Sequence, residues 1–444
     1  MSPHISEDVI GRYALDPRLV YDVEAVEAHL RDCDDCRRSL EEIREFDNDL
    51  ADGDAWGVRD DNLATFSAER AEEDAEAQEL LAEFDDAPST AFVWADLPSN
   101  RDYYTGGVVR ALSKRAHEMA DRDPRYALEL ADAAISIAQR LSEDEYPAMA
   151  LHEWRGEAWK EKASALFCLG RFAETLQAVD RAEAEYNQLS HAGVGHVAVL
   201  YIRASVLYEQ EDYDEASRLL DRSAAAALHL GEIDRYMAAL HMIGSIHYDK
   251  REFSEAAALF ATILRFGERE NLPVWIAREC LTLGSCYVDL GELQEARRHL
   301  EMALLQFTAL RFDTEIARTQ WALALLMFAE GRRVQAIQTL RQSVADFSRF
   351  QMPTDAAIAA VQLAEMLHTM GRNRDIPQLL AGVVQTFTQA GKLTGALTAL
   401  AYLKEAAISG RFSKPLTTHV RRYLSRVDHQ PALLFAPPPP DELV

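Results

Sequence analysis

From about residue 101 onward, apolar positions recur at helical spacing almost without interruption, and turn-like segments break the pattern at a regular step. The turn segments align as LGRFAETL, QEDYDEAS, KREFSEAA, LGELQEAR, EGRRVQAI and GRNRDIPQ. Successive turn positions are 41 residues apart once and 40 thereafter, at Phe172, Tyr213, Phe253, Leu293, Arg333 and Asn373. A repeat of this length predicts an all-α solenoid of stacked helix pairs over residues 101–430.

A small residue stands nine positions before each turn position, as two helices require if they pack closely across a short turn. These residues are Ala163, Ala204, Gly244, Gly284, Ala324 and Ala364. The order of small residue, turn, aromatic, acid and alanine resembles the tetratricopeptide repeat family. The usual period there is about 34 residues, whereas HEAT and armadillo arrays repeat at about 40–47. We expect tetratricopeptide-like pairs with both helices lengthened by about one turn, because the turn signature is theirs.

The flanking segments differ in composition from the repeats. Residues 1–46 form a small head, and residues 47–100 are very rich in Asp and Glu, which predicts a partly disordered acidic linker. Within it, AERAEEDAEAQELLAEF has the pattern of one helix with an apolar end. Such a segment is either a solvated linker or an acidic surface that recruits or competes for a basic partner. After residue 376 the array degenerates into a final helix and cap, and residues 431–444 read as a Pro-rich disordered tail.

The chain is strongly acidic, with 73 Asp and Glu residues against 46 Lys and Arg residues and a formal charge of −27. Such a charge repels nucleic acid and anionic lipid, so we expect neither direct nucleic-acid binding nor membrane binding. The longest apolar run, Trp321 to Ala329, is about half of the ~20 residues that span a bilayer. The N-terminus shows no basic region followed by an apolar one, so a cytoplasmic location is expected.

In the tetratricopeptide pattern, the residues eight and four before the turn position face the concave groove. The first set reads Ser164, Ser205, Ser245 and Ser285, then Leu325; the second reads Cys168, Glu209, Asp249, Asp289 and Ala329, with Tyr208 and Tyr248 beside two of the acids. A serine four residues before an acid shares its helix face. These residues predict a row of acidic and hydroxyl side chains across the groove, called the acidic rung below. It would accept a basic or amide-bearing helix or peptide. The alternative is that these acids are ordinary solvated residues and the serines only give clearance.

The head contains the segment HLRDCDDC, in which His29, Cys33 and Cys36 are separated by four and three residues. On a helix these side chains project to one side, as a tetrahedral site at a helix end requires. Thiolate and imidazole ligands favour Zn²⁺ over Mg²⁺ or Ca²⁺. His4 is the candidate fourth ligand, since no cysteine precedes Cys33. A structural zinc contributes on the order of 10 kcal/mol of folding free energy, which a head of this size needs. The alternative is that the three residues bind nothing.

The stretch HISEDVIGRYAL…VEAVEAHLRDCDDCRRSLEEI resembles the small zinc-binding domain that opens many bacterial anti-sigma factors. That family carries an upstream Cys or His and then H-x3-C-x2-C. The resemblance implies His4, His29, Cys33 and Cys36 as zinc ligands, and a sigma factor whose polymerase-binding surfaces the protein occludes. Many relatives also have a transmembrane helix and a periplasmic sensor, and this sequence shows neither. The redox-responsive relatives have an upstream cysteine where His4 stands here, so a thiol switch of their kind is not expected. The alternative is that Cys33 and Cys36 oxidise together.

Sequence patterns typical of catalysis are missing: there is no GxxxxGK[ST], strand-borne GxGxxG, GxSxG or HExxH. We therefore expect no enzymatic activity. The interpretation that follows is a regulatory protein-binding module whose zinc head controls a sigma factor or similar transcription partner, while the repeat groove binds a second protein or peptide. The alternative is a repeat scaffold or a non-catalytic adaptor subunit of an effector complex, in which the zinc head is only a docking module.

Overall fold

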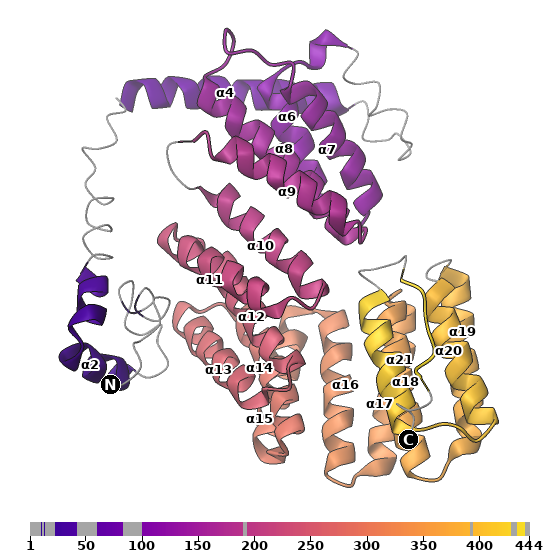
Figure 1. Cartoon of the computed structure of the whole chain (residues 1–444). Helices are drawn as coiled ribbons and strands as arrows, with labels where there is room; N and C mark the ends of the chain where they lie inside the picture. The colour runs from indigo at the N-terminus through magenta and orange to yellow at the C-terminus, as the bar shows by residue number, and fades with distance from the viewer. Residues whose placement is uncertain are drawn as a thin grey trace. The chain divides into compact units, whose positions relative to one another are not determined.

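The computed structural model describes residues 10, 13, 23–41, 60–82, 100–189, 193–390, 394–427 and 433–439. These residues form helices and turns without a strand, so the all-α prediction is confirmed (Figure 1). None of the described helices is long and apolar enough to span a bilayer. The contacts divide the chain into two units, Met1–Leu240 and His241–Val444.

The elements up to the unit boundary are α2 Val23–Asp32, α4 Asp60–Ala82, η4 Arg101–Tyr103, α6 Gly106–Met119, α7 Pro124–Ala138, α8 Ala148–Cys168, α9 Phe172–Tyr186, α10 Val194–Glu209, α11 Tyr213–His229 and α12 Ile233–Asp249, which runs through the boundary. Those that follow are α13 Phe253–Glu270, α14 Pro273–Leu290, α15 Leu293–Leu310, α16 Asp313–Ala329, α17 Arg333–Arg349, α18 Pro353–Thr369, η5 Asn373–Asp375, α19 Ile376–Ala390, α20 Thr394–Ile408 and α21 Lys414–Val427. Consecutive helices pack as pairs, among them α8 with α9 and α14 with α15.

Residues with a left-handed backbone conformation recur about every forty residues, at the turn within each helix pair and at the turn between pairs. Within the pairs, left-handed φ values recur at Gly170, Glu211, Arg251, Gly291, Gly331 and Gly371. Between the pairs they recur at Gly231, Asn271, Arg311 and Gln351. A residue in this conformation reverses the chain after a helix and lets the next N–H bond back to the last turn, as Arg332 N does to Met327 O at 2.8 Å. The predicted helix boundaries therefore coincide with these turns.

The small residues of the repeat lie where the two helices of a pair touch. A Cβ atom on Gly244 would lie 2.4 Å from Cε1 of Phe260, and one on Gly284 would lie 2.5 Å from Cγ of Leu300. The alanines at the equivalent positions are fully buried. The close packing predicted from the sequence is confirmed.

Within the predicted acidic linker, residues 60–82 form the single helix α4 and pack against α6. The Arg110 guanidinium donates to Asp74 Oδ1 at 2.8 Å and to Glu73 Oε2 at 3.0 Å. Leu81 is 0% exposed in a core that also contains Val108 and Leu112. The helix forms because its apolar end is buried and Arg110 offsets part of its charge. Residues 47–59 and 83–99 lie outside the described residues.

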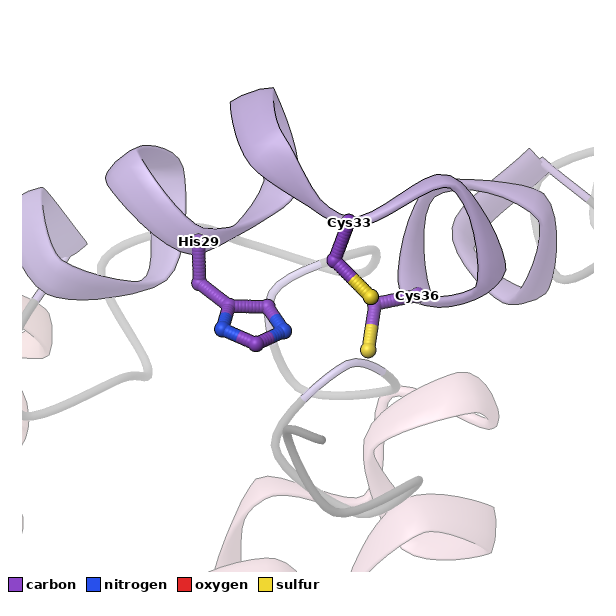
Figure 2. Close-up of side chains that lie close together, drawn as sticks. All are labelled: His29, Cys33 and Cys36. Carbon is purple, nitrogen blue, oxygen red and sulfur yellow. The ribbon is translucent and has the colours of Figure 1, made fainter. Parts of the chain in front are cut away.

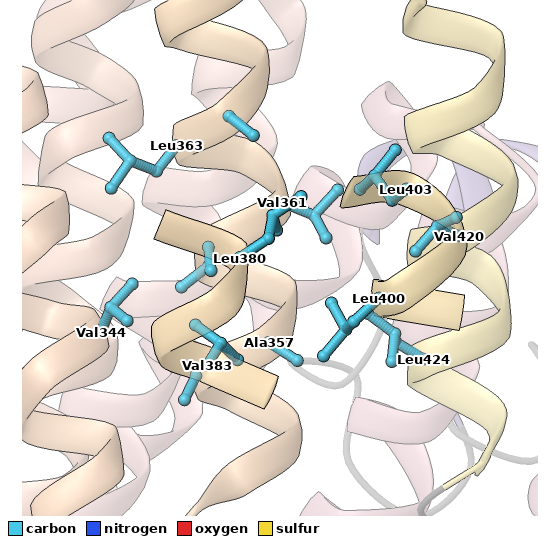
Figure 3. Packing of buried hydrophobic residues seen from close by; sticks show 14 of the residues in the cluster. Val344, Ala357, Val361, Leu363, Leu380, Val383, Leu400, Leu403, Val420 and Leu424 are labelled. Atoms are coloured by element: carbon cyan, nitrogen blue, oxygen red, sulfur yellow. The ribbon is translucent and has the colours of Figure 1, made fainter. Parts of the chain in front are cut away.

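In the second unit, the last helices share one core with α17 and α18 (Figure 3). Helix α21 packs on both α18 and α20, and so closes the array. The predicted disordered tail is wrong for residues 433–439, since Leu433 and Phe435 pack against this core. Tyr423 donates its hydroxyl to Leu433 O at 2.8 Å, and its ring meets that of Phe435 edge-on. Aromatic residues on α20 and α21 hold the tail, which its proline content did not reveal.

Candidate functional site

The candidate metal ligands of the head, His29, Cys33 and Cys36, lie at the end of α2 and in the turn that follows it. Cys33 N donates to His29 O at 2.9 Å, and the next helical turn begins with Arg37 N donating to Cys33 O at 3.1 Å. The Arg37 side chain returns to the last carbonyls of α2, with bonds of 3.1 Å to Leu30 O and 3.2 Å to Arg31 O. A cation at this position offsets the negative end of the helix. The chain therefore bends at Cys33 and carries Cys36 around to the side of α2 that bears His29.

The predicted ligand atoms of His29, Cys33 and Cys36 lie within 4.8 Å of one another (Figure 2). The ligand atoms of a tetrahedral zinc are roughly 3.5 Å apart, so small rotations of the side chains bring this set to bonding distance. The His29 Nε2 atom is buried and has no hydrogen-bond partner in the described part of the chain. A buried nitrogen without a partner is unfavourable unless it binds something. The residues present therefore fit a zinc ion; His4, the predicted fourth ligand, lies outside the described residues.

A small apolar cluster stands behind these ligands. Its buried members are Ile10, Val26, Leu30, Cys36 and Leu40, and Tyr13 and Cys33 pack against it. Tyr13 also donates to Glu27 Oε1 at 3.4 Å, which connects the segment before α2 to that helix. The ligand set thus has an apolar side that keeps water away, but the cluster contains few residues. The candidate metal ligands and the core of the head are in part the same side chains.

The first unit has two cavities along the first helices of its pairs. One of about 520 Å³ is lined mainly by α8, α9 and the start of α10, and one of about 330 Å³ by α6, α8 and α10. Lys160 and Arg235 line both. The predicted groove residues Ser164, Cys168 and Ser205 line the smaller cavity. Burial raises the pKa of the Cys168 thiol to about 12, helped by Asp121, so this thiol stays protonated at neutral pH.

Charged groups are buried beneath these two cavities. Lys160 and Glu161 are 6% and 1% exposed and lie 2.7 Å apart, and Lys160 also donates to Glu157 Oε1 at 2.6 Å. Burial alone would lower the pKa of Lys160, but the charges of Glu157 and Glu161 raise it. Burial would likewise raise the pKa of Glu161, but the His117 hydrogen bond and the Lys160 charge lower it. Both residues are therefore ionised, and Lys160 is the nearest cation to the buried Glu161 among the described residues.

Two glycines leave the space that the Tyr186 ring occupies beside this network. A Cβ atom on Gly156 would lie 2.6 Å from Cε1 of the Tyr186 ring, and one on Gly195 would lie 2.3 Å from its Cζ. The ring fits between α8 and α10 only because both positions lack a side chain. Its hydroxyl donates to Glu157 Oε2 at 3.1 Å, and burial raises the pKa of Tyr186. The wall of the larger cavity is thereby fixed.

The second unit has a cavity of about 330 Å³ along the first helices of its own pairs. Tyr248 from α12, Ser285 and Asp289 from α14, and Leu325 from α16 line it, as their places in the repeat predict. The Tyr248 hydroxyl donates to Asp289 Oδ2 at 2.5 Å and joins two successive pairs. Trp321, Gln362, Arg318 and Arg421 complete the wall. An adjoining cavity of about 260 Å³ shares Leu325 and Gln362 and includes Ala329 and Lys414.

The predicted rung is therefore only partly assembled. Each of its serines donates its hydroxyl to the carbonyl four residues earlier in its own helix, at 2.9–3.2 Å. The serine donors are thus used within the helices, which favours the interpretation that they give clearance. Ser245, Tyr208, Glu209 and Asp249 line none of the four cavities described above, and Glu209 belongs to a different unit from the two aspartates.

Lys160, Tyr201, Leu281 and Trp321 line these cavities but were missed by sequence reasoning. All four stand twelve positions before the turn residue of their repeat. A third row added to the eight-and-four rule would have found them, because twelve, eight and four residues fall on one helix face.

Comparison with known proteins agrees with the repeat fold. Residues 278–349 match the tetratricopeptide repeat family. A curated relative, the BBSome complex member BBS4 homolog of Drosophila melanogaster, is 23% identical over 241 residues, which is 48% of this chain and 49% of that protein. This chain thus spans about half the length of the curated relative it matches.

Among solved structures, a Rap protein in complex with competence and sporulation factor is 12% identical, with a TM-score of 0.53 over 73% of this chain and 88% of that one. Aspartyl phosphate phosphatase F from Bacillus subtilis is 14% identical, with a TM-score of 0.53 over 87% of this chain and 96% of that one. At these identities the likeness concerns the fold. The fold and the family match define a tetratricopeptide-like helical-repeat protein.

Proposed function

We propose that this chain is a regulatory binding protein, with a zinc-holding head that binds one protein and a repeat groove that binds a second. The observation that carries the proposal is the convergence of His29, Cys33 and Cys36, with the buried Nε2 atom of His29 lacking a hydrogen-bond partner in the described part of the chain. Three soft or borderline ligands on one helix end, backed by an apolar cluster, are the arrangement of a structural zinc site.

His29, Cys33 and Cys36 would hold the ion, with His4 as the fourth ligand. Zinc would supply folding energy rather than catalysis, because a closed set of four protein ligands leaves no position for a substrate. The Arg37 bonds to the end of α2 would hold the bend that brings the two thiols to one side. The resemblance of this stretch to anti-sigma zinc domains supports a sigma factor, or a similar transcription protein, as the partner of the head.

The repeat groove supports the second half of the proposal. Stacked first helices expose successive cavities of about 260–520 Å³ with apolar walls and a few charged groups, which suits side chains of a bound protein segment. The Rap protein that shares this fold was solved in complex with competence and sporulation factor. Two modest contacts on one chain would reinforce each other through effective concentration.

The test is affinity capture of the tagged full-length protein from lysate of its native host, followed by mass spectrometry. The proposal expects a sigma factor in near-stoichiometric amount, and its loss in the Cys33→Ser/Cys36→Ser variant or after zinc chelation. The matched control is Cys168→Ser, a thiol outside the head. Recovery of some other protein that ignores the head variant but is lost on changing groove residues would favour the repeat-scaffold alternative instead.

A further inference from the structure

The end of the second unit has a charge opposite to that of the whole chain. Residues 376–427 contain seven Lys or Arg residues and one acid, Glu405, within a chain of net charge −27. Several of these cations are exposed on or next to α21. Among the described residues, Arg411, Lys414 and Arg422 have no acidic group within ion-pair distance. A cluster of unpaired like charges is unfavourable in an isolated protein and favourable against a partner of opposite sign.

Helix α21 brings two of these cations to the groove. Lys414 lines the smaller cavity of this unit and Arg421 the larger, and their spacing of seven residues places both on one face of the helix. The buried Nε of Arg421 lies 3.3 Å from Glu365 Oε1 of α18 and has no hydrogen-bond partner among the residues that the structure describes. A third cation, Arg318 of α16, lines the larger cavity and is held by Glu315 at 2.7 Å and Asp355 at 3.3 Å.

The same two cavities are lined by large apolar side chains. Trp321 and Leu325 line the larger cavity, and Phe328 and Phe412 line the adjoining one. The Trp321 indole donates to Gln362 Oε1 at 2.5 Å and its ring packs edge-on against Phe347, so its orientation is fixed. Asp289, the predicted acidic residue of this stretch, already accepts the Tyr248 hydroxyl. Glu365 also lines the smaller cavity, but it lies beside Arg421. The lining therefore combines apolar side chains with the cations Lys414, Arg421 and Arg318.

We propose that these adjoining cavities bind an acidic protein segment that carries a large apolar side chain. The apolar side chain would pack beside Trp321, and carboxylates would face Lys414 and Arg421. A nucleic acid is disfavoured because a long polyanion would extend over the acidic remainder of the chain, whereas a short peptide meets only charges within a Debye length of about 8 Å. The assignment rests on the proposed binding of a protein by the groove, and it replaces the basic peptide predicted from the sequence at this end of the groove.

The experiment uses the full-length protein and a fluorescein-labelled synthetic peptide of Glu, Phe and Leu, with binding followed by fluorescence anisotropy. The glutamate peptide is expected to bind, and to bind more weakly as salt rises. A peptide with each Glu replaced by Lys is expected not to bind. Lys414→Glu is the first variant, since this exposed side chain is unpaired among the described residues and its change is expected to leave the fold intact. Combined with Arg421→Gln it is expected to weaken binding about tenfold.

The matched control is Arg341→Glu, which makes the same charge change on an exposed position of α17 that lines neither cavity. An equal loss in this control would overturn the assignment, as would preference for the lysine peptide. A single-stranded oligonucleotide that displaces the glutamate peptide and depends on Lys414 would overturn it in favour of nucleic acid. Preference for the lysine peptide would overturn the acidic ligand but would still agree with a groove that binds protein. None of these results tests the capture of a partner by the head. The acidic-ligand assignment and the proposed function can therefore fail independently.

Discussion

The head and the repeat units differ in the interactions that stabilise them. Each repeat buries large side chains such as Phe260, Phe307 and Phe347 against neighbouring helices, and the contacts recur from pair to pair. The head has a described core of five buried residues, one of which is the proposed ligand Cys36. A stack of helix pairs gains stability with every unit added, whereas a small head must obtain it from one strong interaction. Loss of the proposed zinc ion should therefore affect the head and not the repeats.

The largest effect is expected from Cys33→Ser/Cys36→Ser. Zinc contributes on the order of 10 kcal/mol to the folding of small domains, so residues 23–41 should lose protection in hydrogen exchange while residues 101–427 keep theirs. Cys168→Ser should leave the protection of the head unchanged. Simultaneous loss of protection in the array would mean that head and array fold as one cooperative unit.

The next largest effect is expected inside the first unit, from Lys160→Met. The change leaves the buried Glu161 without its nearest cation, which should cost about 3–5 kcal/mol in the free energy of unfolding. Lys162→Met is the control on the same helix, since its partner Asp132 is exposed and such pairs contribute at most about 1 kcal/mol. Chemical denaturation of the two variants compares them. Equal costs would show that the repeats do not depend on this buried network.

A smaller cost is expected from Gly244→Ala, which tests whether helix packing carries the stability of the repeats. The added methyl group meets the Phe260 ring, so the variant should lose about 1–3 kcal/mol. Gly382→Ala on α19 is the control, because nothing lies within 4 Å of its added atom and alanine should stabilise the helix by up to about 1 kcal/mol. Thermal unfolding separates the two, and destabilisation by both changes would contradict the packing argument.

The smallest effect is a pH dependence at His117. Its hydrogen bond with Glu161, and then the charge of that carboxylate, raise the pKa of His117 above the usual 6.5, whereas burial and Lys160 lower it. A raised pKa in the folded state contributes stability that is fully present below the unfolded value and is lost as pH rises through the folded value. His117→Gln should therefore destabilise the protein at about pH 5.5 and have little effect at about pH 9.

Lys114→Gln, an exposed change on the same helix, should show no such dependence on pH. A His117→Gln loss that is equal at both pH values would remove the proposed linkage.

Most of the repeat fold could be predicted because its determinants are local. The turn residues with left-handed φ, such as Gly291 and Gly331, and the small residues nine positions before each turn position recur at a visible step. The three described metal-ligand candidates could be predicted for the same reason, since they lie within one short stretch. In both cases a pattern of neighbours in sequence is enough to fix the geometry.

The parts that could not be predicted depend on contacts between distant segments. Arg110 holds the acidic helix α4 across 36 residues, and Phe435 finds its aromatic partners on α20 and α21. Arg421 reaches the groove only because α21, which follows the end of the repeat pattern, packs against α18. No spacing rule along the chain contains this information.

The most direct test of the account is the zinc content of the purified full-length protein, measured by inductively coupled plasma mass spectrometry. The account predicts one Zn²⁺ per chain in the wild type, retention in Cys168→Ser, and loss in Cys33→Ser/Cys36→Ser and in His29→Ala. A wild-type protein without zinc after purification in the absence of chelators, or one whose zinc persists in these head variants, would contradict it.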